Sequence, residues 1–194
     1  MKKIIIEPAL ILLPLFVLST DVRIDFIIYL VCVFLHELGH ILAAHMLKVK
    51  INCMHLDIFG ARLDLDFKNL SYKAEMCISF AGPLVNIILC IIGSIFIKAR
   101  AGDRLLFFVL VNISLALINL IPIRSLDGGR LVSSFFHMVC RYDKAEQICE
   151  VLSLICIVCL WTLSVFAWFA AEKNVLLALL CMYLFVHIVI NREY

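Results

Sequence analysis

Two histidines and a glutamate stand close together in one of the most apolar stretches of the chain. His36, Glu37 and His40 lie within LVCVFLHELGHILAAHML, residues 30–47. On an α-helix, positions i and i+4 are about 40° apart around the axis, so both imidazoles project from one face. That spacing allows both to ligate one Zn²⁺, and Glu37 beside them can move a proton to or from water. The pattern HExxH is typical of zinc proteases for this reason.

The alternative interpretation is that these histidines are hydrogen-bonded groups in a helix core. An ionisable residue inside a membrane span costs about 2.5–3.5 kcal/mol on insertion scales and by default indicates a functional site. Three such residues within five positions need a compensating partner. A divalent cation supplies one, so we favour the metal site.

Zinc in a catalytic site needs a third protein ligand and keeps a fourth position for water. Asp127 is the better candidate, because it closes an apolar run that ends at the same membrane face as residues 24–47. Gly128 and Gly129 follow it and allow the backbone to approach another helix closely. The alternative role for Asp127 is the N-cap of a short amphipathic helix at 128–140.

The other histidines are poorer candidates for the third ligand. His45 lies five residues after His40, about 140° round a helix, and points away from the pair. We interpret it as an interfacial histidine. Three more histidines lie near run ends or in loops, where we expect interfacial or surface positions: His55, His137 and His187.

The composition is that of a membrane protein. Of 194 residues, 64% are hydrophobic and 16% are charged, whereas a soluble domain is about half apolar and a quarter charged. The net charge of +2 is small and no nucleic-acid-binding motif is present, so we expect no nucleic acid partner. Most of the nine cysteines lie in apolar runs, where cysteine packs as a small hydrophobe.

The elements that must position the site are apolar helices. The sequence predicts an all-α membrane protein, a polytopic bundle of about six transmembrane helices that forms a single domain over residues 1–194. The six runs are residues 4–18, 24–47, 73–98, 104–123, 148–170 and 174–191. Alternating residues between the second and third runs predict a small β-hairpin at about 51–67. We expect the first run to be an anchor and not a removed signal peptide.

The basic residues predict how the chain crosses the membrane. Of 17 lysines and arginines, 12 fall in the alternate loops that include the N-terminus and 5 fall in the others. The positive-inside rule therefore favours a multi-pass protein of the cell membrane with both termini in the cytoplasm. The metal would then lie roughly 15–18 Å below the cytoplasmic surface, in a site that opens toward the cytoplasm.

Three motifs in order carry a family resemblance. HELGH at 36–40, AGPLVN at 81–86 and NLIPIRSLDGGR at 119–130 resemble the site-2 protease family of intramembrane zinc metalloproteases, above all its bacterial stage IV sporulation type. The resemblance implies an endopeptidase with one zinc per chain. Its substrate would be a membrane-tethered protein, such as a pro-sigma or anti-sigma factor, cleaved within or near its transmembrane segment in regulated intramembrane proteolysis.

The resemblance also implies roles for individual residues. His36, His40 and Asp127 match the zinc ligands, and Glu37 matches the catalytic acid or base. Asn86 and Asn119 match polar groups near the site, where either could donate to the substrate backbone or to an oxyanion. The alternative for both asparagines is a polar contact that joins two helices.

Two further expectations concern substrate and control. A substrate must be extended for cleavage, so we expect the 51–67 hairpin to offer a strand edge for pairing, with Leu63 and Leu65 at that edge. The chain stops at Tyr194, without the CBS domain of the sporulation type or the PDZ domains of other branches. We interpret it as a minimal or truncated member and leave room for a membrane inhibitor partner.

Two other functions stay open at this point. A non-catalytic zinc-binding membrane protein or zinc carrier would place acidic or histidine residues along several spans, whereas one such cluster is visible. A catalytically silent binding protein would tend to lose Glu37 or a ligand, and here all four matching residues are present.

Overall fold

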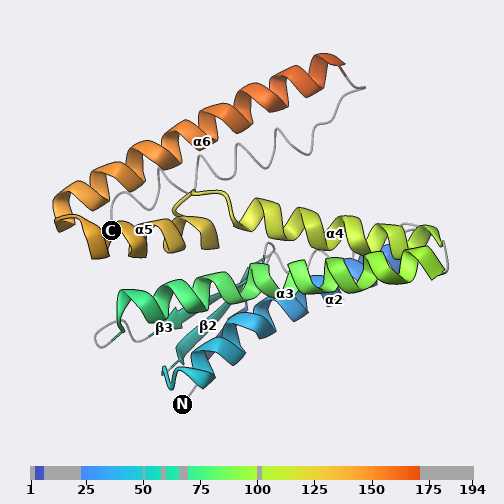
Figure 1. The fold of residues 1–194 in the computed structure, drawn as a ribbon, viewed down its shortest axis with the longest axis horizontal. Coiled ribbons are helices and arrows are strands. Elements are labelled where there is room, and N and C mark those ends of the chain that lie inside the picture. The colour runs from blue at the N-terminus through green and yellow to red at the C-terminus, as the bar shows by residue number, and fades with distance from the viewer. Residues whose placement is uncertain are drawn as a thin grey trace. The chain divides into compact units, whose positions relative to one another are not determined.

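The computed structural model describes residues 3–6, 23–49, 51–57, 60–65, 70–99 and 102–170 (Figure 1). The chain divides into two compact units, Met1–Ile118 and Asn119–Tyr194. The prediction of a single domain over the whole chain is not tested by this division.

The first unit is built on two long helices that pack against each other, α2 (Arg23–Met46) and α3 (Tyr72–Ala99). They approach closely where Gly39 faces Ala81, because a Cβ on Gly39 would lie 2.8 Å from the Ala81 carbonyl oxygen. The third helix, α4 (Asp103–Asn119), follows α3 after a short connection. Glycine on α2 thus places the two histidines of that helix next to the backbone of α3.

The first unit also contains a three-stranded sheet with the order β1-β2-β3. Strand β1 (Lys3–Ile6) runs parallel to β2 (Ile51–Asp57), and β2 is antiparallel to β3 (Gly60–Leu65). Strands β2 and β3 fall within the 51–67 segment for which the sequence predicts a hairpin. Strand β3 also contacts α2.

Strand β1 corrects the sequence analysis at the N-terminus. Residues 4–18 were expected to form one apolar run, but residues 4–6 belong to β1 and pair with Met54, His55 and Leu56. The physical reason is a distant partner, because the β-branched isoleucines that start the run favour a strand once β2, 50 positions later, offers an edge. Residues 7–18 lie outside the described residues.

The second unit pairs α5 (Asp127–Val139) with α6 (Tyr142–Ala170). Its core holds Ile123 and Ile157, which are buried, and four partly buried residues that pack around them: Ile121, Leu126, Cys156 and Leu160. The sequence predicted a short amphipathic helix at 128–140, and α5 confirms it. The core packs the 121–126 loop against α6, immediately before α5 begins.

Three helices in the described residues are long and apolar enough to cross a membrane, namely Ile24–Met46, Tyr72–Ile97 and Tyr142–Leu163. They overlap three of the six predicted runs, and the third begins and ends about two turns earlier than the predicted run 148–170. Helix α4 has 17 residues, and the predicted run at 174–191 lies outside the described residues. The chain is therefore a helical membrane protein, and six spans remain a prediction. Large apolar side chains on these helices are exposed, as Phe34 is at 65%, which fits contact with lipid.

Candidate metal centre

His36 and His40 lie one turn apart on α2, as the HExxH spacing predicts. Both residues are buried, with 4% and 6% of their surface exposed. Their Nε2 atoms are 3.2 Å apart, and the two rings meet edge to face at 79°. Two imidazole nitrogens are therefore directed at one buried point.

The other nitrogen of each ring contacts an oxygen on α3. His40 Nδ1 lies 2.7 Å from the carbonyl oxygen of Ile78, and His36 Nδ1 contacts Oδ1 of Asn86. A carbonyl oxygen only accepts, so both Nδ1 atoms must donate and carry the ring hydrogen. Each neutral ring then presents a lone pair at Nε2, which is the form that ligates a metal.

This arrangement fits a bound cation. In two neutral imidazoles with Nδ1–H, the lone pairs at Nε2 face each other across 3.2 Å and repel. A divalent ion would remove that repulsion, since both nitrogens could act as its ligands. Metal-bound histidines generally donate their second N–H to a carbonyl or an amide oxygen in this way.

Gly82 leaves the space that these rings occupy. A Cβ at this position would lie 2.3 Å from Nε2 of His40 and 2.8 Å from Nε2 of His36. Both candidate ligand atoms, together with His40 Cε1 at 2.6 Å, would therefore meet it, so the missing side chain forms a cradle for the imidazole edges. The AGPLVN motif thus supplies a glycine at the pair and, one turn later on α3, Asn86 as a hydrogen-bond partner.

Glu37 follows His36 on α2, and its Oε2 atom is buried. On a helix it lies about 100° round the axis from His36. Glu37 therefore stands next to the pair in the helix and on a different face of it.

Asp127 is the first residue of α5 and is half-buried. The N-cap position is Leu126, and no side chain makes a capping hydrogen bond there. The alternative role of Asp127 as the N-cap is therefore wrong. A carboxylate in the first turn is favoured by the helix dipole, which places partial positive charge at that end.

The two glycines after Asp127 allow α5 to lie close to the backbone of the loop that precedes it. A Cβ on Gly128 would lie 2.2 Å from the carbonyl oxygen of Leu120, and one on Gly129 would lie 2.0 Å from that of Ile123. The close approach predicted from this glycine pair therefore involves the 120–124 segment of the same unit. This close approach fixes the position of the first turn of α5, which contains Asp127.

The chain matches a known protein family over most of its length. A sequence model of Peptidase family M50 matches residues 25–102 and 96–163. The chain belongs to this family. A zinc metalloprotease of Methanocaldococcus jannaschii is 32% identical to the M50 chain over 166 residues, which cover 77% of the chain and 48% of the relative. Stage IV sporulation protein FB of Bacillus subtilis is 30% identical over 122 residues, which cover 61% and 42%.

A solved structure described as the site-2 protease from Methanocaldococcus jannaschii is similar to the M50 chain with a TM-score of 0.71 at 25% identity. The match covers 95% of this chain and 88% of that one. The chain spans about half the length, or less, of the curated relatives above. The family expected from the sequence is confirmed by these matches.

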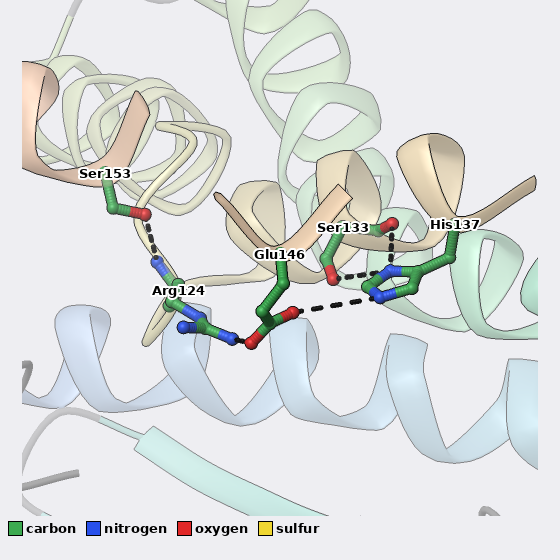
Figure 2. A network of polar contacts seen from close by, with 5 residues as sticks. All are labelled: Arg124, Ser133, His137, Glu146 and Ser153. Carbon is green, nitrogen blue, oxygen red and sulfur yellow. Dashed lines mark hydrogen bonds and ion pairs between the residues drawn. The ribbon is translucent and has the colours of Figure 1, made fainter. Parts of the chain in front are cut away.

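A polar network holds the loop before Asp127 in this M50 chain (Figure 2). The backbone N–H of Arg124 donates to Ser153 Oγ at 3.2 Å, and that hydroxyl donates to the carbonyl oxygen of Pro122 at 3.3 Å. The Arg124 guanidinium forms an ion pair with Glu146. Two hydrogen bonds and one ion pair to α6 thus hold the loop that contains Arg124 and Ser125.

His137 was expected at an interface or on the surface, and the structure corrects this. Its side chain is 8% exposed and lies at the end of this network, with Nε2 3.7 Å from Glu146 Oε2 (Figure 2). Its Nδ1 lies 2.8 Å from the Ser133 carbonyl oxygen, and its ring packs on Tyr142. The side chain is covered because α6 turns back over α5 directly after it.

The remaining predicted residues fall at different places. Asn86 is fully buried and contacts His36, which favours a positioning role over contact with substrate. Asn119 is the half-buried last residue of α4, and Leu63 and Leu65 lie in β3, opposite Met54 and Ile51. His45 is exposed in the last turn of α2, as expected for a residue that is not a ligand.

Sequence reasoning missed Asn112, a fully buried residue of α4 that accepts a hydrogen bond from Asn86. The signal was present, because Asn112 is an amide in the middle of the apolar run 104–123. A polar residue there needs a partner, and none could be named without the helix packing.

Proposed function

We propose that this M50 chain is a zinc-dependent intramembrane endopeptidase that cleaves a membrane-tethered protein within or near its transmembrane segment. The observation that carries the proposal is the buried pair of imidazoles on α2, with both Nδ1 atoms engaged and both Nε2 atoms converging. Histidine nitrogens in this form are zinc ligands, and α2 is apolar enough to place them inside a membrane.

We assign the zinc ligands to His36, His40 and Asp127. Two neutral imidazoles and one carboxylate would leave the metal centre with a net positive charge. The local structure supports Asp127 as the third ligand. Asp127 is the first residue of α5, and the backbone of the preceding loop is hydrogen-bonded to α6. A ligand that begins a helix after a fixed loop has little freedom to lose on binding.

The proposed chemistry is hydrolysis of a peptide bond. When bound, zinc would polarise the scissile carbonyl and lower the pKa of a water, so that water attacks near neutral pH. Glu37 would take the proton from that water and return it to the nitrogen of the leaving amine. Asn119 would donate a hydrogen bond to the substrate backbone or to the developing oxyanion.

The substrate class follows from chemistry and from resemblance. A transmembrane helix hides its backbone, so the substrate must unwind locally before water can attack. We propose a pro-sigma or anti-sigma factor, since one relative is a sporulation protein. We also propose that the site opens toward the cytoplasm and that both termini lie there, as the basic residues favour.

Strand β3 supports a proposal for how the unwound substrate is held. Within the described residues it is the last strand of the sheet, with β2 on one side, and it contacts α2. An extended peptide could pair with its outer side, beside Leu63 and Leu65.

Single proline substitutions at successive positions along residues 61–65 test this pairing. Proline removes a backbone N–H. At positions whose N–H faces away from β2, proline should lower the rate of substrate cleavage. At the positions between them, it should weaken the pairing of β3 with β2 instead. Cleavage of a tethered reporter and zinc content are measured together. The expected result is reduced cleavage with unchanged zinc at alternate positions. Full activity in every variant would remove β3 from the substrate path.

Replacement of the third ligand tests the proposed function as a whole. We expect Asp127→Ala to lose zinc affinity by more than the roughly 10–100-fold typical of outer partners of a metal site, and to lose cleavage with it. Zinc content is measured on protein purified without chelators. Asp143→Ala is the matched control, because Asp143 also lies in the first turn of a helix, α6. Asp127→Ala protein that keeps zinc at wild-type affinity would contradict the assignment.

A further inference from the structure

Asn112 lies on α4 and has a set of contacts that reach the metal centre indirectly. Its Oδ1 accepts a hydrogen bond of 2.8 Å from Asn86 Nδ2. Its Nδ2 donates to the Phe108 carbonyl oxygen at 2.9 Å and lies 3.2 Å from Cys32 Sγ on α2. The residue is fully buried, so its amide cannot exchange these hydrogen bonds for bonds to solvent.

The direction of each bond in this chain of amides is fixed from one end. The Phe108 carbonyl oxygen accepts and cannot donate, so the NH₂ group of Asn112 must face it and Oδ1 must face α3. The NH₂ group of Asn86 then faces Asn112, and Asn86 Oδ1 faces His36. An amide oxygen at His36 Nδ1 selects the tautomer with hydrogen on Nδ1 and a lone pair on Nε2.

We propose that Asn112 is a positioning residue for zinc binding, because it fixes the orientation of the Asn86 amide and thereby the tautomer of His36. The proposal rests on the assignment of His36 as a ligand. An amide has an oxygen on one side and an NH₂ group on the other, and the two groups are nearly the same size. A flipped amide therefore fits the same space. Without Asn112, Asn86 can turn over and present NH₂ to His36, which stabilises the tautomer with hydrogen on Nε2, where no metal can bind.

The alternative is a purely structural role for Asn112, as a polar contact that holds α4 to α2 and α3. The two roles differ in what they predict for zinc. Loss of a helix contact lowers the stability of the whole chain. Loss of tautomer control raises the zinc concentration needed to fill the site, and leaves the rate at saturating zinc near that of the wild type, because bound zinc itself selects the correct tautomer.

Asn112→Thr and Asn112→Val form an isosteric pair that separates these roles. A threonine hydroxyl on a helix donates to the carbonyl four residues earlier, here Phe108, and keeps an oxygen toward Asn86. Valine has the same shape and no polar group. We expect Asn112→Val to lower zinc affinity by roughly 10–100-fold, the usual effect of removing an outer partner of a metal site, and Asn112→Thr to recover most of it.

The measurement is chelator competition on the full chain in nanodiscs, with cleavage of a tethered reporter followed as zinc is added. Ser94→Ala is the control, because Ser94 Oγ also donates to a carbonyl four residues earlier, that of Cys90, on an exposed part of α3. It should keep wild-type affinity. The proposal is overturned if Asn112→Val binds zinc as the wild type does, or if Thr and Val variants lose affinity equally.

Nitrogen NMR of the wild-type holoprotein labelled with ¹⁵N-histidine gives a test that does not depend on how the variants fold. His36 should show a hydrogen on Nδ1 and the shift of a metal-bound nitrogen at Nε2. Zinc on Nδ1 of His36 would overturn the proposal. Absence of any zinc in the wild type would instead overturn the proposed function, so the two failures are distinguishable.

Discussion

Glu37→Gln should keep its zinc and lose cleavage by roughly 10²–10⁴-fold, the usual contribution of a general acid–base group. Glutamine has the same shape as glutamate and cannot take a proton from water. Zinc should stay because the contacts of the pair on α2 with Ile78 and Asn86 are left in place by the substitution. The measurement is cleavage of a membrane-tethered reporter together with metal analysis of the same purified protein.

The same variant separates the candidate functions. A zinc carrier with this site would keep its zinc-dependent activity after Glu37→Gln, and a silent binding protein would show no cleavage before the change. Glu75→Gln is the matched control, since Glu75 is an acidic residue in the first turn of the neighbouring helix α3. We expect the control to cleave at close to the wild-type rate. Undiminished cleavage by the Glu37 variant would exclude the assigned role.

Gly82→Ala should remove zinc from a chain that still folds. The new methyl group would lie 2.3 Å from His40 Nε2, which is the far end of a side chain and can be displaced. Displacement moves the ligand atom itself and pulls His40 Nδ1 away from the Ile78 carbonyl oxygen. Metal analysis should therefore find little zinc, and cleavage should be absent, while circular dichroism shows the helical content of the wild type.

Gly93→Ala is the control for helix packing. It is the same substitution on the same helix, and its Cβ would meet Val109 Cγ2 at 2.6 Å, on α4 and not on a histidine. We expect this variant to lose thermal stability and to retain one zinc per chain. The cradle interpretation of Gly82 fails if Gly82→Ala binds zinc as tightly as Gly93→Ala does.

The parts of the site that are close in sequence could be predicted from the sequence. The i, i+4 spacing of His36 and His40 follows from helix geometry alone, and α2 confirms it. The amphipathic helix after Asp127 was predicted to within about a residue because its apolar period is local. The same locality explains why β2 and β3 fall in the predicted segment, since two adjacent strands need only a short turn.

The parts that depend on packing between distant segments could not be predicted. The partner of His36 is Asn86, 50 residues away, and the partner of Asn86 is Asn112 on another helix. Residue type narrows these contacts to amides in apolar runs but cannot choose among them. Strand β1 was mistaken for part of a span for the same reason, because its partner residues in β2 lie 50 positions later.

The contacts of the two imidazoles with Ile78 and Asn86, and the contact of Asn86 with Asn112, join α2, α3 and α4, and these three helices precede Asp127 in the chain. During translation, this half of the centre can therefore mature while the segment with Asp127 is still emerging from the ribosome. A newly made protein could capture its ion on two preset nitrogens and gain the carboxylate afterwards, so that proteolytic competence would be acquired last.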